Sequence, residues 1–276
     1  MTKDGWMCMK RLLVLLLILG TAPAVSAAGL TLGGITEFQV ELPKDLRTMA
    51  GRGQLSPVTH ALVTIAAPSN LDMAHEFPVM IISATSDPEY NSSRKLLLAY
   101  YEVALQASWI LVAADPGTEI TVGQDDVPMR LALNTAALAV LAKQWPGANA
   151  ASMAFGGFSG GAKYSEWLAA AFAGQGRNVI GIYLAGINIS TLVDAAQQFN
   201  VMNDRFKRIP IFLQSGEADK VSTPADHQKI ATELQRVGFK NIRVGVLPGA
   251  HEVDPGPFRN ALEWFRQFTV VAPAGK

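Results

Sequence analysis

The sequence has a single cysteine, Cys8, and charged residues make up only 17% of its 276 positions. Cys8 precedes the first hydrophobic run, so the rest of the chain can form neither a disulfide nor a catalytic thiol. Basic and acidic residues number 23 each, and the net charge of +0 provides no basic field for nucleic acid and no polybasic membrane-binding segment. The low charge and the 49% hydrophobic content instead predict a folded globular domain.

Long hydrophobic runs are also absent. The apolar run at residues 12–19 is too short to cross a bilayer, which takes about 20 residues. Lys10 and Arg11 precede it, and small residues follow it at positions 24–28. This arrangement is typical of a secretory signal peptide, and a membrane-tethering helix is the alternative. We predict a signal peptide at residues 1–27, a secreted or periplasmic protein, and no stable membrane insertion once the signal is removed.

Short apolar segments alternate with helical patterns along the rest of the chain. Strands are predicted at residues 36–43, 60–67, 78–83, 109–115, 151–155, 178–186, 209–216 and 242–249. Helices are predicted at residues 94–107, 127–144, 161–173, 223–237 and 257–268. The alternation predicts one α/β domain at residues 28–276, with a mostly parallel sheet and helices on both faces. Between the strands at 178–186 and 209–216 there is room for one helix but not for a large lid domain.

Polar residues of three chemical types follow three of the predicted strands. Ser159 follows residues 151–155, Asp219 follows residues 209–216, and His251 follows the apolar part of residues 242–249. Active sites of parallel sheets lie beyond the carboxyl ends of the strands, so we expect these side chains to meet there. A histidine can take the proton of a serine hydroxyl, and a carboxylate on its other nitrogen holds the required tautomer. The three residues therefore predict a nucleophilic serine enzyme.

Glycines surround Ser159 in the stretch GGFSGG at residues 156–161. A serine raised on a sharp turn between a strand and a helix has a strained backbone, and small neighbours relieve the crowding. The N–H of Gly160 would then point toward the carbonyl under attack. A phosphate-binding loop would need lysine directly after the last glycine, but Ala162 intervenes. A tight bend without a catalytic role is the remaining alternative.

The segments GFSGG, SGEADKVSTP and LPGAHEV resemble the nucleophile elbow, acid loop and histidine loop of the α/β-hydrolase superfamily. The resemblance covers nearly all of residues 28–276 and implies the α/β-hydrolase fold. It also implies that Ser159 is the nucleophile, Asp219 the acid and His251 the base. Because the chain has no room for a lid, its predicted layout is most similar to the dienelactone-hydrolase and small-carboxylesterase branches of this superfamily.

The loop after the third predicted strand departs from the family pattern. Many members carry His-Gly or a glycine run there, whereas this chain has Ser-Ala-Thr-Ser at residues 83–86. We assign the second oxyanion donor beside Gly160 to Thr85, with Ala84 as the alternative. Tyr90 and Phe158 are predicted to bind substrate, and plain core packing is the alternative for both.

The other histidines are weaker candidates for the base. His60 begins an early strand, His75 lies in a polar loop, and His227 is expected to be solvated in the first turns of a helix. No group of histidines, cysteines or carboxylates has metal-ligand spacing. We therefore expect no metal and no cofactor.

Several carboxylates compete with Asp219 for the role of the acid. Glu217 and Asp226 are the alternatives nearest to it in the sequence. Asp115 also follows a strand but is expected to cap a turn with Pro116, and residues 125–126 are expected to form a solvated turn.

Together these features predict an exported serine hydrolase that cleaves small-molecule or polymer esters through an acyl-enzyme, with no nucleic-acid partner. One alternative is a serine peptidase or amidase that uses the same site, although such peptidases usually carry a gating domain. Another is a non-catalytic binding protein on a hydrolase scaffold, for which the altered loop at residues 83–86 is the one supporting feature.

Overall fold

The computed structural model describes residues 29–72, 75–85, 92–118 and 125–268, so the predicted signal peptide and Tyr90 lie outside the described residues. The strands are β1 (Gly34–Glu41), β2 (His60–Ala67), β3 (Val79–Ser83), β4 (Ile110–Pro116), β5 (Met153–Phe158), β6 (Val179–Ala185), β7 (Ile211–Gly216) and β8 (Ile242–Leu247). The helices are α2 (Lys44–Ala50), α3 (Ser93–Gln106), α4 (Val127–Gln144), α5 (Gly160–Gly174), α6 (Leu192–Gln198), α7 (Pro224–Arg236) and α8 (Pro255–Arg266), with 3-10 turns η1 (Pro146–Asn149) and η2 (Phe206–Arg208).

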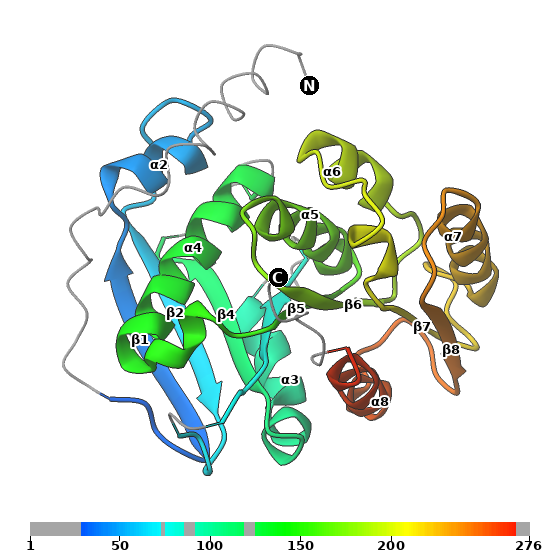
Figure 1. The fold of residues 1–276 in the computed structure, drawn as a ribbon, viewed down its shortest axis with the longest axis horizontal. Coiled ribbons are helices and arrows are strands. Elements are labelled where there is room, and N and C mark those ends of the chain that lie inside the picture. The colour runs from blue at the N-terminus through cyan, green and yellow to red at the C-terminus, as the bar shows by residue number, and fades with distance from the viewer. Residues whose placement is uncertain (1–28, 73–74, 86–91, 119–124, 269–276) are drawn as a thin grey trace, which may run out of the picture.

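The strands form one sheet in the order β1-β2-β4-β3-β5-β6-β7-β8. β2 is antiparallel to both of its neighbours, β1 and β4. From β4 to β8 every neighbouring pair is parallel, so the carboxyl ends of β3 to β8 share one edge. The predicted mostly parallel sheet is confirmed, and Figure 1 shows it running through the molecule.

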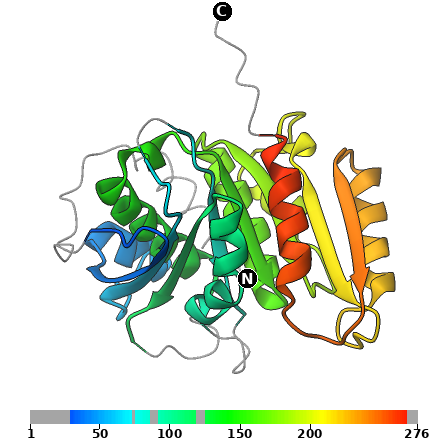
Figure 2. The same ribbon diagram turned by 90° about the horizontal axis from the view of Figure 1, so that it is seen from below.

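Helices cover both faces of this sheet, as predicted. One core lies beneath α2, α4, α5, α6 and α7, and a second lies beneath α3 and α8. Figure 2 shows α3 and α8 side by side across the second face. In β3, Val79 and Ile81 belong to the first core, and Met80 and Ile82 belong to the second. Because both faces of β3 are buried, its residues 79–82 are all apolar rather than alternating.

Two short helices differ in how far the sequence could predict them. The 25 residues that separate β6 from β7 contain only α6 and η2, in agreement with the prediction of one helix and no large lid domain. Helix α2 was not predicted, because it has seven residues and begins after Pro43 without a side-chain cap. Tertiary packing stabilises it instead: Leu46 and Met49 are buried in the first core.

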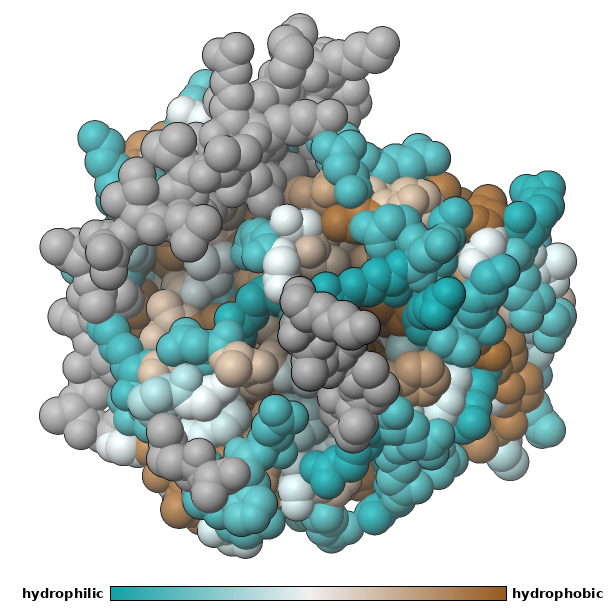
Figure 3. Space-filling view, viewed as in Figure 1, coloured by the Kyte–Doolittle hydropathy of each residue, from teal (hydrophilic) through white to brown (hydrophobic). Residues whose placement is uncertain are grey.

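On the described part of the face drawn in Figure 3, hydrophilic and hydrophobic residues are interspersed. Among the described residues, the exposed large hydrophobic side chains are scattered over β2, β8 and four connecting segments; they are Leu32, Leu55, Leu62, Ile189, Val221 and Val246. Scattered exposed apolar residues are ordinary for a folded domain. None of the described helices combines the length and hydropathy that a membrane span requires.

Candidate active site

Ser159 lies between β5 and α5, where the chain turns at the carboxyl edge of the sheet. Its φ of 54° and ψ of −119° form a conformation that residues other than glycine rarely adopt. The Ser159 N–H donates a 2.8 Å hydrogen bond to the Ala185 carbonyl at the end of β6, and its carbonyl accepts one of 3.1 Å from the Ala162 N–H. These bonds hold a strained serine at the start of a helix, which is the geometry expected of the GFSGG stretch.

Two glycines beside Ser159 allow the loop after β3 to lie directly against this turn. A Cβ added to Gly157 would lie 2.5 Å from the Ser83 carbonyl oxygen. A Cβ added to Gly161 would lie 2.7 Å from the Ala84 carbonyl carbon. Real Cβ contacts do not come this close, so any side chain at either position would push β5 and α5 away from the end of β3.

His251 and Asp219 follow the neighbouring strands β8 and β7 and are hydrogen-bonded to each other. His251 Nδ1 lies 2.8 Å from Asp219 Oδ2. Asp219 Oδ1 accepts hydrogen bonds of 2.8 Å from the N–H groups of Val221 and Ser222. The Asp219 side chain is 1% exposed and that of His251 is 20% exposed. The carboxylate is thus fixed in the interior, while part of the imidazole remains open to solvent.

The imidazole lies next to the turn that carries Ser159. Its ring centroid is 4.6 Å from that of Phe158, the residue before the serine. A Cβ added to Gly186 would lie 2.9 Å from His251 Cε1 and 2.8 Å from Phe158 Cε2. Gly186 follows Ala185, the residue that accepts the Ser159 N–H. The structure therefore brings the turn that carries Ser159 next to the imidazole of His251, which in turn is bonded to the carboxylate of Asp219.

The predicted oxyanion donors are neighbours. Gly160 is the first residue of α5, and the first N–H groups of a helix have no partner within that helix. A Cβ added to Gly160 would lie 2.5 Å from Thr85 Oγ1, so the two residues are in direct contact. The Ala84 N–H donates a 3.3 Å hydrogen bond to Ser93 Oγ. This bond directs the Ala84 N–H toward Ser93, and the assignment of the second oxyanion donor to Thr85 stays a prediction.

The two predicted substrate-binding residues have different outcomes. Phe158 is 1% exposed, so its ring supports the imidazole from the interior and offers almost no open surface to a ligand. Its contact with substrate stays a prediction. Tyr90 falls outside the described residues, and its role is likewise untested.

Several solved structures similar to this chain are esterases or serine hydrolases. A cold-adapted esterase from an Arctic intertidal metagenomic library matches with a TM-score of 0.56 and 12% identity, covering 89% of this chain and 99% of that chain. A Xanthomonas campestris protein, described as a serine hydrolase without a lid, matches with a TM-score of 0.53 and 16% identity, covering 94% and 99%. An esterase of Rhizomucor miehei matches with a TM-score of 0.55 and 15% identity, covering 86% and 85%.

The chain has the α/β-hydrolase fold. No family model matches the sequence, and the search of curated proteins finds no match. At 12–16% identity the likeness is one of fold, so the roles of individual residues must be argued from the site itself.

Within this α/β-hydrolase fold, Arg130 is a buried cation that sequence reasoning missed. Its Nε and Nη2 donate hydrogen bonds of 2.6 Å to the two carboxylate oxygens of Asp125. Its Nη1 donates a 2.8 Å bond to Ser93 Oγ and lies 3.6 Å from Asp115 Oδ1. Burial alone would lower the pKa of Arg130, but hydrogen bonds to Asp125 and the charges of Asp125 and Asp115 raise it. An arginine within the otherwise apolar start of α4 was the available signal.

This network corrects two predictions about carboxylates. Asp115 does not simply cap a turn with Pro116; its oxygens accept the N–H groups of Ser93 and Arg94 and so cap the start of α3. Residues 125–126 do not form a solvated turn, since Asp125 pairs with Arg130 and the Asp126 side chain accepts the Met129 N–H at the start of α4. The contacts of Asp115 join residues more than 20 positions apart and could not be predicted from the local sequence.

Glu166 is a second buried charged residue, on α5. Its carboxylate accepts hydrogen bonds from the Ser190 hydroxyl, from the Thr191 N–H at 2.6 Å and from Thr191 Oγ1 at 2.8 Å. Burial raises the pKa of Glu166 from 4.5 to about 7, although these bonds and the charge of Lys163 oppose the shift. Glu166 thereby anchors the loop after β6, which begins with Gly186 beneath His251.

His227 is buried and not solvated as predicted, because α7 turns this residue toward the interior. Its Nε2 lies 2.9 Å from Ser222 Oγ, and the Ser222 N–H donates to Asp219. Burial lowers the pKa of His227, while the nearby Ile187 backbone and the charges of Asp219 and Asp226 oppose this change. The imidazole therefore supports the acid loop from behind and is not a rival for the base.

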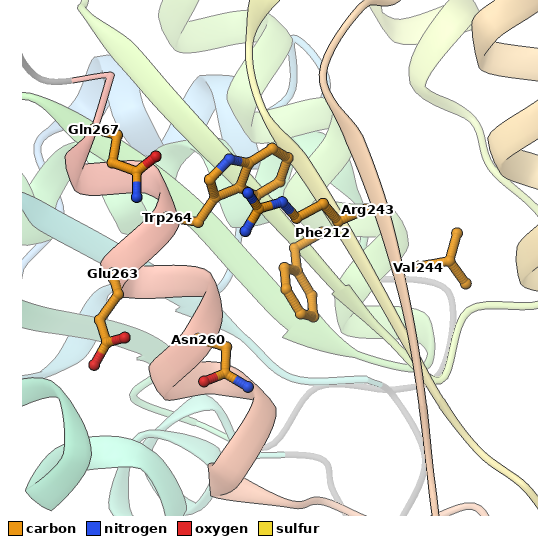
Figure 4. Close-up of a pocket in the computed structure, with 7 residues that line it drawn as sticks. All are labelled: Phe212, Arg243, Val244, Asn260, Glu263, Trp264 and Gln267. Carbon is orange, nitrogen blue, oxygen red and sulfur yellow. The ribbon is translucent and has the colours of Figure 1, made fainter.

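A groove between α8 and the edge strand β8 lies elsewhere (Figure 4). Its volume is about 490 Å³, and the Arg243 guanidinium lies 4.3 Å from the Trp264 ring centroid in its wall. Phe212 and Arg243 stand near the amino ends of β7 and β8, whereas Asp219 and His251 follow the carboxyl ends. The groove is therefore separate from the candidate active site. No group of three or more metal-ligating side chains occurs among the described residues.

Proposed function

We propose that this protein is an exported serine hydrolase that cleaves carboxylic esters through an acyl-enzyme. The 2.8 Å hydrogen bond between His251 and Asp219, on loops next to the strained Ser159 turn, is the observation that carries the proposal. A buried carboxylate that holds one imidazole nitrogen leaves the other nitrogen to exchange a proton with a hydroxyl. Esterases among the proteins of similar fold favour an ester as the substrate.

The reaction begins with attack of Ser159 Oγ on the ester carbonyl carbon. His251 Nε2 takes the hydroxyl proton as the new bond forms, and Asp219 stabilises the imidazolium through Nδ1. The carbonyl oxygen becomes an oxyanion, which the N–H groups of Gly160 and Thr85 stabilise by hydrogen bonding. Both donors belong to segments that pack against each other, so little rearrangement is needed when the charge develops.

The alcohol leaves with the proton from His251, and the acyl group remains on Ser159. His251 then takes a proton from water, and the resulting hydroxide attacks the acyl carbonyl carbon. The Ser159–acyl bond breaks, Ser159 Oγ regains the proton, and the carboxylic acid is released. Each step uses only water and the side chains already described.

Export is supported by the sequence of residues 10–28, which has the charge, apolar run and small residues of a secretory signal. The shortness of the segment between β6 and β7 favours an open site that accepts small or polymeric esters. Sequencing the amino terminus of the protein recovered outside the cytoplasm tests the export part, and an uncleaved terminus would contradict it.

The catalytic part is tested by hydrolysis of p-nitrophenyl acetate. Ser159→Ala and His251→Ala should each lower kcat by about 10⁴-fold or more, as removal of either member of such a pair does. His75→Ala is a matched control, because His75 Nδ1 also bonds to an aspartate, Asp72 Oδ2, at 2.7 Å. The His75–Asp72 pair is exposed and belongs to another loop, so its loss should leave kcat unchanged.

A wild-type rate equal to that of Ser159→Ala would end the proposal. Equal losses in His251→Ala and His75→Ala would show that unfolding, rather than proton transfer, explains the effect. Comparison of ester and amide substrates in the same assay separates esterase from peptidase activity.

A further inference from the structure

The loop at residues 83–85 has to keep one conformation for the proposed oxyanion hole to work. Its packing against Gly157, Gly160 and Gly161 fixes its distance from the serine turn. Packing alone does not decide which N–H group faces the reacting carbonyl, because rotation of one peptide plane exchanges an N–H for a carbonyl oxygen at nearly constant volume. A directional contact on the loop is required for that choice.

Ser93 supplies this directional contact. Its side chain is fully buried, and its Oγ accepts the Ala84 N–H at 3.3 Å. The peptide plane between Ser83 and Ala84 therefore turns its N–H toward α3. With that plane fixed, the next N–H along the loop belongs to Thr85, whose side chain already touches Gly160.

Arg130 in turn fixes Ser93. Arg130 Nη1 donates a 2.8 Å hydrogen bond to Ser93 Oγ, and the Ser93 N–H donates a 2.8 Å bond to Asp115 Oδ1. The two bonds of 2.6 Å from Arg130 to Asp125 hold the guanidinium plane. Bidentate pairs of this kind fix orientation as well as distance. The network thus connects β4, α3 and α4 to the loop after β3.

We propose that Ser93 and Arg130 are positioning residues that set the oxyanion loop, so that Thr85 rather than Ala84 supplies the second oxyanion donor. This role rests on the proposed esterase function. Loss of the Ser93 hydroxyl frees the Ala84 N–H and lets the peptide planes at residues 83–85 rotate. Because the oxyanion forms only during reaction, the loss should lower kcat and leave KM nearly unchanged.

The experiment compares Ser93→Ala with Ser56→Ala. Ser56 is also a buried serine whose Oγ accepts a backbone N–H, that of Val58 at 3.2 Å, and its described hydrogen bonds do not reach residues 83–85. Ser93→Ala should lower kcat for p-nitrophenyl acetate about 10- to 100-fold, with KM within about threefold of wild type. Ser56→Ala should leave both constants within about twofold.

A second readout separates positioning from loss of structure. The second-order rate of labelling by a fluorophosphonate, whose phosphonyl oxygen occupies the oxyanion hole, should fall with kcat in Ser93→Ala. Ser93→Thr keeps the hydroxyl and should recover most of the rate. If Ser93→Ala does not fold, Asp125→Asn weakens the hold on Arg130 without touching the loop and should lower kcat by a smaller factor, about 3- to 10-fold.

Three outcomes would overturn the proposal. One is a folded Ser93→Ala protein with wild-type kcat. Another is a fall in kcat that Ser56→Ala shares, because a general loss of stability would then be the cause. The third is wild-type protein without esterase activity, which removes the proposed function itself and is distinguished by the wild-type assay alone.

Discussion

Two buried charged residues on the same face of the sheet, Arg130 and Glu166, are compensated in different ways. Arg130 on α4 has two carboxylates within 4 Å, those of Asp125 and Asp115. Glu166 on α5 has no cation within salt-bridge distance among the described residues and is held by the neutral groups of Ser190 and Thr191. The pKa of Arg130 is raised further from neutrality, whereas burial brings the pKa of Glu166 to about 7.

The difference between Arg130 and Glu166 shows how the loops on the two sides of the candidate active site are held in place. The loop after β3 is fixed through Arg130, whose guanidinium stays ionised at every pH at which the protein is folded. The loop after β6, which begins beneath His251, is fixed by a carboxyl group that changes its charge near neutral pH. A buried ionisable group therefore keeps its charge, and with it its contacts, over the whole pH range only where counter-charges lie next to it.

The largest effect on stability is expected for Arg130→Met. Methionine has a similar length but leaves the carboxylates of Asp125 and Asp115 buried without a cation. Breaking a buried pair in this way should lower the free energy of unfolding by about 3–5 kcal/mol. Urea unfolding followed by circular dichroism measures the loss, and a change below about 1 kcal/mol would contradict the idea that Arg130 compensates these charges.

A smaller effect, dependent on pH, is expected for Glu166→Gln. The pKa of Glu166 rises from 4.5 in the unfolded chain to about 7 in the folded protein, so the folded state binds the proton more tightly. The resulting stabilisation is fully present below pH 4.5 and is lost as pH rises through 7. The loss is on the order of 3 kcal/mol. Glutamine removes this dependence, because its oxygen can accept from Thr191 and its amide group can donate to the Ser190 hydroxyl.

Unfolding of both proteins at pH 5 and pH 8 measures the difference. The stability of Glu166→Gln relative to wild type should increase between these two pH values by up to that amount. Glu233→Gln, an exposed change on α7, controls for the loss of one charge. A constant difference between Glu166→Gln and wild type at the two pH values would show that Glu166 does not titrate in the folded protein over this range.

The sequence was sufficient to predict where the strands lie, because the apolar run of each strand can be read from its own residues. Residues 78–82 are apolar throughout because both faces of β3 are covered, and this run can be read without knowledge of the neighbouring strands. Helix α2 was missed because its stability comes from packing of Leu46 and Met49 against distant residues. The antiparallel pairing of β2 with β1 and β4 likewise depends on contacts between distant segments.

The residues of the candidate site likewise differ in whether the sequence alone could predict them. Ser159, Asp219 and His251 were identified because each follows a strand, and the sheet topology makes the ends of parallel strands converge. Arg130 and Glu166 were missed because their partners come from other elements, for example Ser93 and Thr191. The burial of His227 could not be predicted, since whether the first turn of a helix faces solvent depends on what packs against it.

The smallest effect is expected for Arg52→Ala, which removes an exposed arginine–aspartate pair. Arg52 pairs with one carboxylate, that of Asp126, the residue after Asp125, whereas the buried Arg130 pairs with both Asp125 and Asp115. The side chain of Arg52 is 50% exposed and that of Arg130 is 2% exposed. Alanine keeps the Cβ of Arg52, whose φ is 55°, so backbone strain is the same in both proteins. The loss of unfolding free energy should be below about 1 kcal/mol and should shrink further in high salt, since water and ions screen exposed charges. A loss as large as that of Arg130→Met would contradict the expectation that an exposed pair with one carboxylate stabilises this fold much less than the buried network of Arg130.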